Sequence, residues 1–193
     1  LGVRTLNVEP ANNIAEIARK DGIETVNEFW GTKVAKEIVK KYGKAKIITG
    51  TNVFAHVNDL DEFIEAAKTA LEDDGALIVE FPYLADMIEK TEFDTIYHEH
   101  LSYIAVRPMI TISKRMGMEV VDAVRTDVHG GSIRIYFMKA GKGKVSNKVG
   151  ELVNLEKKMG LDSFGTYEEF GGRVEEIRRE LISLLKRLKS EGK

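Results

Sequence analysis

The chain has 193 residues, 43% of them hydrophobic, which is enough for one domain with a substantial core or for one domain plus an appendage. Lys and Arg total 29 against 31 Asp and Glu, and this balance argues against nucleic acid or an anionic membrane as a partner. The absence of cysteine excludes disulfides, thiolate zinc sites and a cysteine nucleophile, and it fits a reducing cytoplasm. No apolar run approaches the roughly 20 residues that span a bilayer, so we expect a cytoplasmic protein without membrane contact.

The first part of the chain alternates short apolar runs with helical patterns. Strands are predicted at residues 4–8, 23–26, 46–50 and 76–81. Helices are predicted between them at residues 11–20, around 34–39 with an end near Gly43, and at 60–71. Asp73-Asp-Gly75 is predicted to be a turn. Four such repeats indicate a mainly parallel α/β sheet with helices on both faces.

The pattern changes after Pro82. Helices are predicted at residues 84–90 and 108–116, followed by two strands at 118–124 and 132–138 that are predicted to close the sheet as an antiparallel pair. From Val145 onward the sequence is helical, with an apolar stripe that requires a partner surface: Val174, Ile177, Leu181, Leu184, Leu185 and Leu188. We therefore predict a domain over residues 1–140 and a helical extension or linker over 141–193.

Polar residues follow the predicted strands, where an open α/β sheet binds its ligands. Glu9 closes the first strand and could accept hydrogen bonds from a ribose, although a solvated acid at a strand end is equally compatible with its position. The other strands are followed by Asn27–Trp30, Thr51–His56 and Glu80–Tyr83. Together they predict a polar rim for a nucleotide cofactor, but no G-x-G-x-x-G loop accompanies them.

The stretch TIYHEHLSY, residues 95–103, places two of the four histidines around a glutamate. If residues 97–100 are extended, Tyr97 and Glu99 face one way while His98 and His100 face the other. A metal site built on the H-x-H pair would need at least a third ligand. The remaining interpretations are a histidine acting as an acid or base near neutral pH and a structural histidine bonded to a carboxylate. His129-Gly-Gly-Ser132 is either an ordinary glycine turn or a place where the backbone approaches a ligand.

Four segments resemble the S-adenosylmethionine-dependent sugar C-methyltransferases, which act on nucleotide-linked 4-keto-deoxysugars. They are Asn52–Val57, Glu80–Tyr83, Phe93–Tyr103 and His129–Arg134, in that order and at family-like spacing. The resemblance extends from about residue 4 to about residue 140, and FDTIYHEH is its most specific part. It implies a Rossmann-like class I methyltransferase sheet, S-adenosyl-L-methionine as cofactor, and a role in deoxysugar biosynthesis.

The family's reaction transfers a methyl group to the carbon next to a ketone, which requires a base and stabilisation of an enolate. The resemblance implies His100 as the base, Tyr97 and Glu99 as positioning groups, and His56 as a further catalytic contact. It also assigns two sets of binding residues, for the cofactor Glu9, Glu28, Phe29 and Asn52, and for the substrate Tyr83, His129, Ser132 and Arg134. His98 is expected to be structural, and no metal is expected.

The chain departs from the family in lacking the N-terminal cysteine-rich zinc domain, the first strand with its glycine-rich loop, and the C-terminal α/β domain. We therefore expect an N-terminally truncated sheet with a C-terminal helical extension, and a homo-oligomer or a complementing chain as partner. Two other hypotheses stay open at this point. One is a fold remnant or interaction module that does not bind the cofactor, and the other is a nicotinamide-dependent enzyme in which Glu9 holds the ribose.

Overall fold

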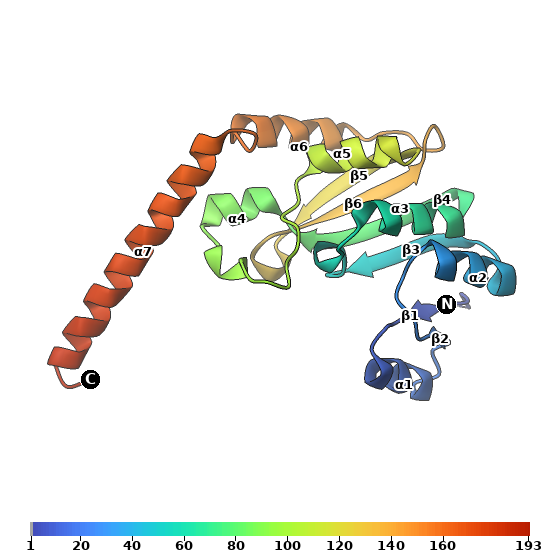
Figure 1. Ribbon diagram of the computed structural model, residues 1–193. Helices are drawn as coiled ribbons and strands as arrows, with labels where there is room; N and C mark the ends of the chain where they lie inside the picture. Colours follow the sequence, from blue (N-terminus) through green and yellow to red (C-terminus); the bar gives the residue numbers. More distant parts are fainter. Residues whose placement is uncertain (1) are drawn as a thin grey trace.

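The computed structural model describes residues 2–193 and contains a four-stranded mixed sheet. Its strand order is β3 (Ala45–Thr51), β4 (Leu71–Pro82), β6 (Ser132–Lys139) and β5 (Met118–Thr126) (Figure 1). β3 and β4 are parallel, whereas β6 runs antiparallel to both β4 and β5. The expected antiparallel pair at the end of the sheet is therefore confirmed.

The first two strands form a sheet of their own. β1 (Asn7–Val8) and β2 (Thr25–Val26) are parallel, each two residues long, and joined by α1 (Asn12–Lys20). The mainly parallel sheet that we expected from the four repeats is instead divided in two: β1 pairs with β2, β3 pairs with β4, and no strand within residues 2–193 joins β1 to β3. Figure 1 shows this small unit beside the free edge of β3.

The predicted turn at 73–75 lies inside β4. Ala45 pairs with Leu71 but Ile47 pairs with Ala76, so the intervening residues of β4 bulge out of the ladder. A Cβ atom at Gly75 would lie 3.0 Å from the Ala45 carbonyl oxygen and 3.0 Å from Leu71 Cδ2. Glycine therefore serves here to let two backbones approach, which sequence alone does not distinguish from a turn.

Three helices cover one face of the main sheet. They are α3 (Leu60–Ala70), α5 (Val106–Arg115) and α6 (Asn147–Lys158), and α2 (Thr32–Tyr42) packs on α3. Alternate residues of β4 and β6 point into this core: Leu77, Val79, Phe81, Ile133, Ile135 and Phe137. The residues between them, such as Ile78 and Tyr136, point to the other face of the sheet and are only half-buried. We expected helices on both faces, but the extensive helical packing is on one face.

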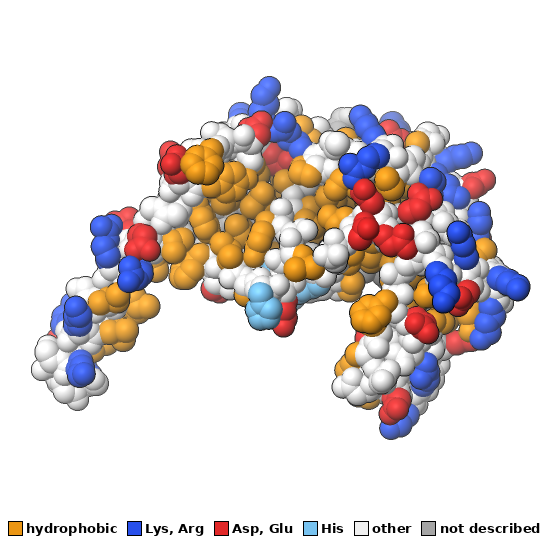
Figure 2. Space-filling model, viewed as in Figure 1, with side chains coloured by type: hydrophobic (Ala, Val, Ile, Leu, Met, Phe, Trp, Pro, Cys, Tyr) orange, Lys and Arg blue, Asp and Glu red, His pale blue; other side chains and the backbone are white. Residues whose placement is uncertain are grey.

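The last helix leaves the body of the protein. α4 (Leu84–Lys90) meets the start of α7 (Phe164–Ser190) through a small cluster of Met87, Ile88 and Phe170. Arg173 reinforces this contact by donating to the Ile88 carbonyl at 2.6 Å. Farther along, α7 exposes residues of the predicted apolar stripe, including Ile177, Leu181, Leu184 and Leu185. Figure 2 shows hydrophobic side chains on the side of this helix that is turned toward the rest of the molecule. No helix within residues 2–193 is long and apolar enough to cross a membrane.

α6 joins the main core through a buried carboxylate. Glu156 is 1% exposed, and its Oε1 accepts from the Tyr83 hydroxyl at 2.9 Å and from the Val106 amide at 2.6 Å. Oε2 accepts from the Arg107 amide at 3.1 Å. The two amides are at the first turn of α5, where helical N–H groups lack internal partners and the helix dipole favours an anion. The helical segment after residue 141 therefore contributes to the same core as the sheet, although the predicted domain division remains a prediction.

Glu156→Ala should lower the free energy of unfolding by about 3 kcal/mol, because it leaves two buried donors and one partly buried donor without an acceptor. Urea unfolding followed by circular dichroism measures this loss. Glu151→Ala, at an exposed position of the same helix, is the matched control and should change stability little. Equal effects of the two substitutions would contradict the role of the buried carboxylate.

Candidate functional site

The YHEH segment is a turn, not an extended strand. It follows the short helix η2 (Phe93–Thr95), and the His100 amide donates to the Tyr97 carbonyl at 3.1 Å. The Tyr97 and His100 rings therefore come together, with centroids 4.2 Å apart. Tyr97 and His100 would face opposite ways only if residues 97–100 were extended, and the turn does not meet that condition. His98 and Glu99 have exposed side chains.

Hydrogen bonds fix the tautomer of His100. Its Nδ1 lies 2.9 Å from the Thr95 carbonyl oxygen, which can only accept, so Nδ1 carries the proton. In the neutral ring Nε2 is then an acceptor, and it lies 3.0 Å from the Tyr97 hydroxyl, which donates to it. The ring is half-buried between these two contacts. His100 thus presents an oriented basic nitrogen on the side of Tyr97.

His56 lies beside this pair. It ends the short helix η1 (Phe54–His56), and its Nδ1 donates to the Glu99 carbonyl oxygen at 2.8 Å. The His56 and His100 rings have centroids 4.9 Å apart. The Ala55 carbonyl holds the segment in place by accepting from the amides of Leu101 and Ser102 at 2.9 and 3.2 Å. Glu99 therefore contributes its backbone carbonyl here, while its carboxylate faces solvent.

A small cavity borders His100, and Tyr83 forms part of its wall. The lining residues are Ala55, Pro82, Tyr83, Leu84, Met87, Thr95, His100, Ser102 and Tyr103. Burial, together with the Glu156 carboxylate, raises the pKa of Tyr83 far above its ordinary value, so its hydroxyl is a neutral donor to Glu156. The Tyr83 hydroxyl is thus bound to Glu156 inside the protein.

The other residues assigned to the substrate differ in accessibility. Ser132 is fully buried and its hydroxyl donates to the Val128 carbonyl at 2.9 Å. Arg134 donates to Glu80 Oε2 from Nε at 2.9 Å and from Nη2 at 2.6 Å. His129 is exposed and has a positive φ of 53°. The first two side chains therefore already have partners within the protein, whereas His129 is free to meet a ligand.

The residues assigned to the cofactor lie at strand ends of both sheets. Glu9 follows β1, and its Oε1 accepts from the Ala11 amide at 2.8 Å at the start of α1. Glu28 and Phe29 follow β2, and Phe29 is 80% exposed. Asn52 follows β3 with a positive φ of 54°, and its amide donates to the Glu80 carbonyl at 2.8 Å. All four are at the carboxyl ends of strands, but they are not part of the His56–Tyr97–His100 cluster.

Three polar contributors had no local signal in the sequence. Glu156 reaches Tyr83 across 73 residues, and the carbonyls of Thr95 and Ala55 are backbone groups that no residue type reveals. Among residues 2–193, no group of three His, Asp or Glu side chains is arranged to hold a metal ion. The geometry of the His56–Tyr97–His100 cluster, with Nδ1 of both histidines bonded to backbone carbonyls, is compatible with the transfer of protons.

Two family models match the chain. Residues 2–123 match the Methyltransferase domain, and residues 127–193 match the C-methyltransferase C-terminal domain. C-methyltransferase NovU from Streptomyces niveus is 35% identical over all 193 residues of this chain, which correspond to 46% of NovU. The chain thus spans about half the length of this curated relative.

Solved structures share the fold at low sequence identity. The CcbJ methyltransferase from Streptomyces caelestis has a TM-score of 0.56 at 11% identity, over 72% of this chain and 76% of CcbJ. Magnesium protoporphyrin IX methyltransferase from Synechocystis, solved with bound S-adenosylhomocysteine, has a TM-score of 0.53 at 10% identity, over 72% of this chain and 65% of its own.

The fold is therefore that of the class I S-adenosylmethionine-dependent methyltransferases, as the sequence led us to expect. The chain belongs to the Methyltransferase domain family, whose model matches most of it, and the rest matches a C-methyltransferase model. The resemblance to C-methyltransferases and the cofactor class that it implies are thereby confirmed.

Neutral His100 and His56 should both carry their proton on Nδ1, because carbonyl oxygens accept from that atom in each ring. Two-dimensional ¹H–¹⁵N spectra of the imidazoles at alkaline pH report the tautomer directly. Tyr97→Phe should leave the tautomer of His100 unchanged, since the Thr95 carbonyl decides it, and exposed His98 serves as the internal reference. A proton found on Nε2 of His100 would refute the arrangement.

Proposed function

We propose that the chain is part of an S-adenosylmethionine-dependent enzyme that methylates the carbon next to the ketone of a nucleotide-linked keto-deoxysugar. The observation that carries this proposal is the Thr95–His100–Tyr97 hydrogen-bond chain, which orients a basic imidazole nitrogen beside a cavity. The 35% identity to a C-methyltransferase supports the reaction class. The lack of cysteine motivates a cytoplasmic location.

His100 would begin the reaction by removing the proton on the carbon next to the ketone. The Nε2 lone pair takes this proton, and the C–H electron pair becomes the enolate. Tyr97 donates to Nε2 in this structure, and because its side chain is 43% exposed it can move aside for the substrate. A freed Tyr97 hydroxyl can then donate to the enolate oxygen. His56, when protonated, can do the same from Nε2 while Nδ1 keeps its bond to Glu99.

The strand-end residues fit a nucleoside cofactor. Glu9 is held at the end of β1 through Oε1, which leaves its other oxygen for ribose hydroxyls, and exposed Phe29 offers an aromatic face to an adenine. Bound S-adenosylmethionine would supply the electrophilic methyl group for the enolate carbon and would leave as S-adenosylhomocysteine. Glu28 and Asn52 are proposed as further cofactor contacts.

We also propose a homo-oligomer or a complementing chain as partner, because β1 and β3 lie at free edges of their sheets within the described residues.

Calorimetric titration of the chain with S-adenosylhomocysteine should give micromolar binding if these residues suffice for the cofactor. Glu9→Gln should weaken that binding about tenfold by removing an acceptor of the ribose hydroxyls. Glu16→Gln, on the exposed surface of α1, is the control and should bind normally. A folded chain without detectable binding would instead favour an interaction module that has lost the cofactor.

His100→Asn should abolish methyl transfer and slow the exchange of the substrate's α-proton with D₂O at least about 100-fold, since both need the base. Mass spectrometry of a nucleotide-linked 4-keto-deoxysugar incubated with the active protein measures the exchange without the methyl-transfer step. S-adenosylhomocysteine affinity should stay within a few-fold. His98→Asn is the matched control, and exchange at the unaltered rate in His100→Asn would remove His100 as the base.

A further inference from the structure

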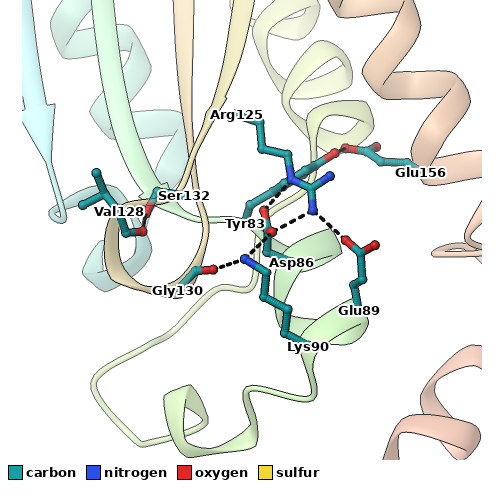
Figure 3. Close-up of polar contacts among 9 residues, drawn as sticks. All are labelled: Tyr83, Asp86, Glu89, Lys90, Arg125, Val128, Gly130, Ser132 and Glu156. Atoms are coloured by element: carbon teal, nitrogen blue, oxygen red, sulfur yellow. Dashed lines mark hydrogen bonds and ion pairs between the residues drawn. The ribbon is translucent and has the colours of Figure 1, made fainter.

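The loop His129–Ser132 rests on a buried ion cluster whose centre is Asp86 of α4. Asp86 is 1% exposed. Arg125 donates to both of its oxygens, from Nε to Oδ2 at 2.9 Å and from Nη2 to Oδ1 at 2.7 Å. Lys90 Nζ lies 3.0 Å from Oδ1 (Figure 3). Burial by itself would raise the pKa of Asp86, but the hydrogen bonds from Arg125 and Lys90 outweigh it and hold the pKa below its ordinary value.

The cluster reaches the loop in two ways. Lys90 Nζ, bound to Asp86, also donates to the Gly130 carbonyl oxygen. The Asp86 side chain packs directly on Gly131, where a Cβ atom would lie 2.2 Å from Asp86 Cγ. The contact of Lys90 fixes the Gly130 carbonyl (Figure 3), and the packing of Asp86 on Gly131 fixes how closely the loop backbone approaches α4.

The loop conformation needs such support. His129 and Gly130 both have positive φ, 53° and 85°, and for a non-glycine residue that conformation persists when its surroundings impose it. The Gly131 carbonyl is held from the other side by the Tyr83 amide at 3.0 Å. His129, whose side chain is exposed, is therefore presented by a backbone fixed at the residues that follow it.

Glu89 belongs to the rim of the cluster. It accepts from Arg125 Nη2 at 2.6 Å, but its side chain is 55% exposed and it makes none of the loop contacts described for Asp86 and Lys90. An exposed ion pair contributes little to stability, whereas a buried carboxylate between two cations is costly to remove. Glu89 is thus the natural comparison for Asp86.

We propose that Asp86 is a positioning residue for the substrate loop, acting through Lys90 on the Gly130 carbonyl and through its packing on Gly131 to set where His129 presents its imidazole. This rests on the proposed function insofar as His129 is taken to meet the substrate. The geometric part of the proposal depends only on the loop.

The chain's four histidines allow this geometry to be tested by ¹H–¹³C spectra of the imidazoles, each signal assigned by single substitution. Asp86→Asn should shift or broaden the His129 signal while those of His56 and His100 stay in place. Lys90→Met, at a partly exposed position, should do the same and covers the case in which Asp86→Asn does not fold. Glu89→Gln should leave all four signals unchanged. An unmoved His129 signal in every folded variant of Asp86 and Lys90 would overturn the proposal.

A rescue experiment tests the packing contact. Gly131→Ala should disturb the His129 signal because of the clash with Asp86, and the loss of stability caused by Asp86→Ala should be smaller in the Gly131→Ala chain than in the unsubstituted chain, because Asp86→Ala also removes that clash. In an active preparation, Asp86→Asn should raise KM for the keto-sugar about tenfold with kcat within a few-fold, since positioning a binding group changes KM more than the chemical step. A moved His129 signal without any methyl transfer by the unsubstituted protein would retain the positioning role and remove the proposed function.

Discussion

The buried carboxylate of Glu156 is the interaction on which the arrangement of the C-terminal half depends. A carboxylate with so little exposure requires hydrogen-bond donors, and its donors come from the end of β4, at Tyr83, and from the first turn of α5. These donors assemble only when α6 is seated beside α5 and β5. One side chain of α6 therefore ties three elements together, and one of those elements supplies the wall of the cavity beside His100.

The orientation of the histidines also depends on contacts that the fold brings together. Backbone carbonyls, not carboxylates, decide which nitrogen of His100 and His56 carries the proton. A carbonyl of a folded segment has no protonation state of its own near neutral pH, so the tautomers depend on the fold and not on a second titrating group. The turn at residues 97–100 then gives Tyr97 a direct hydrogen bond to the remaining nitrogen of His100. Such an arrangement suits the removal of a proton from a carbon acid, where the base has to be oriented before the substrate arrives.

The family match places these groups on a methyltransferase fold, and the chain spans about half of its C-methyltransferase relative. The β1–β2 unit carries Glu9, Glu28 and Phe29, while the four-stranded sheet carries Asn52 and the histidines. The residues proposed for the cofactor are thus divided between the two sheets, whereas the histidine cluster belongs to the larger unit. Because of this division, the functional proposal includes a partner strand. The ion cluster at Asp86 belongs to the unit of the larger sheet, so its contacts with the loop do not require such a partner.

The sequence by itself determined the order and type of most elements, the closing antiparallel pair and the residues proposed for the site. Periodicity is a local property, and YHEH with HGGS is specific enough to indicate the family. The strand ends of Glu9 and Asn52 were also predictable, because a polar residue after an apolar run marks the end of a strand. Tertiary structure decided what local pattern does not encode. Contacts between residues far apart in the chain decide several features. These are the turn that brings Tyr97 to His100, the bulge around Gly75, the division into two sheets, and the hydrogen-bond partners of Tyr83, Ser132 and Arg134. Glu156 and Asp86 show most clearly why local pattern is not enough. Each is an ordinary acidic residue of a helix in the sequence, and only the packing of distant elements around it makes it a buried carboxylate that binds those elements.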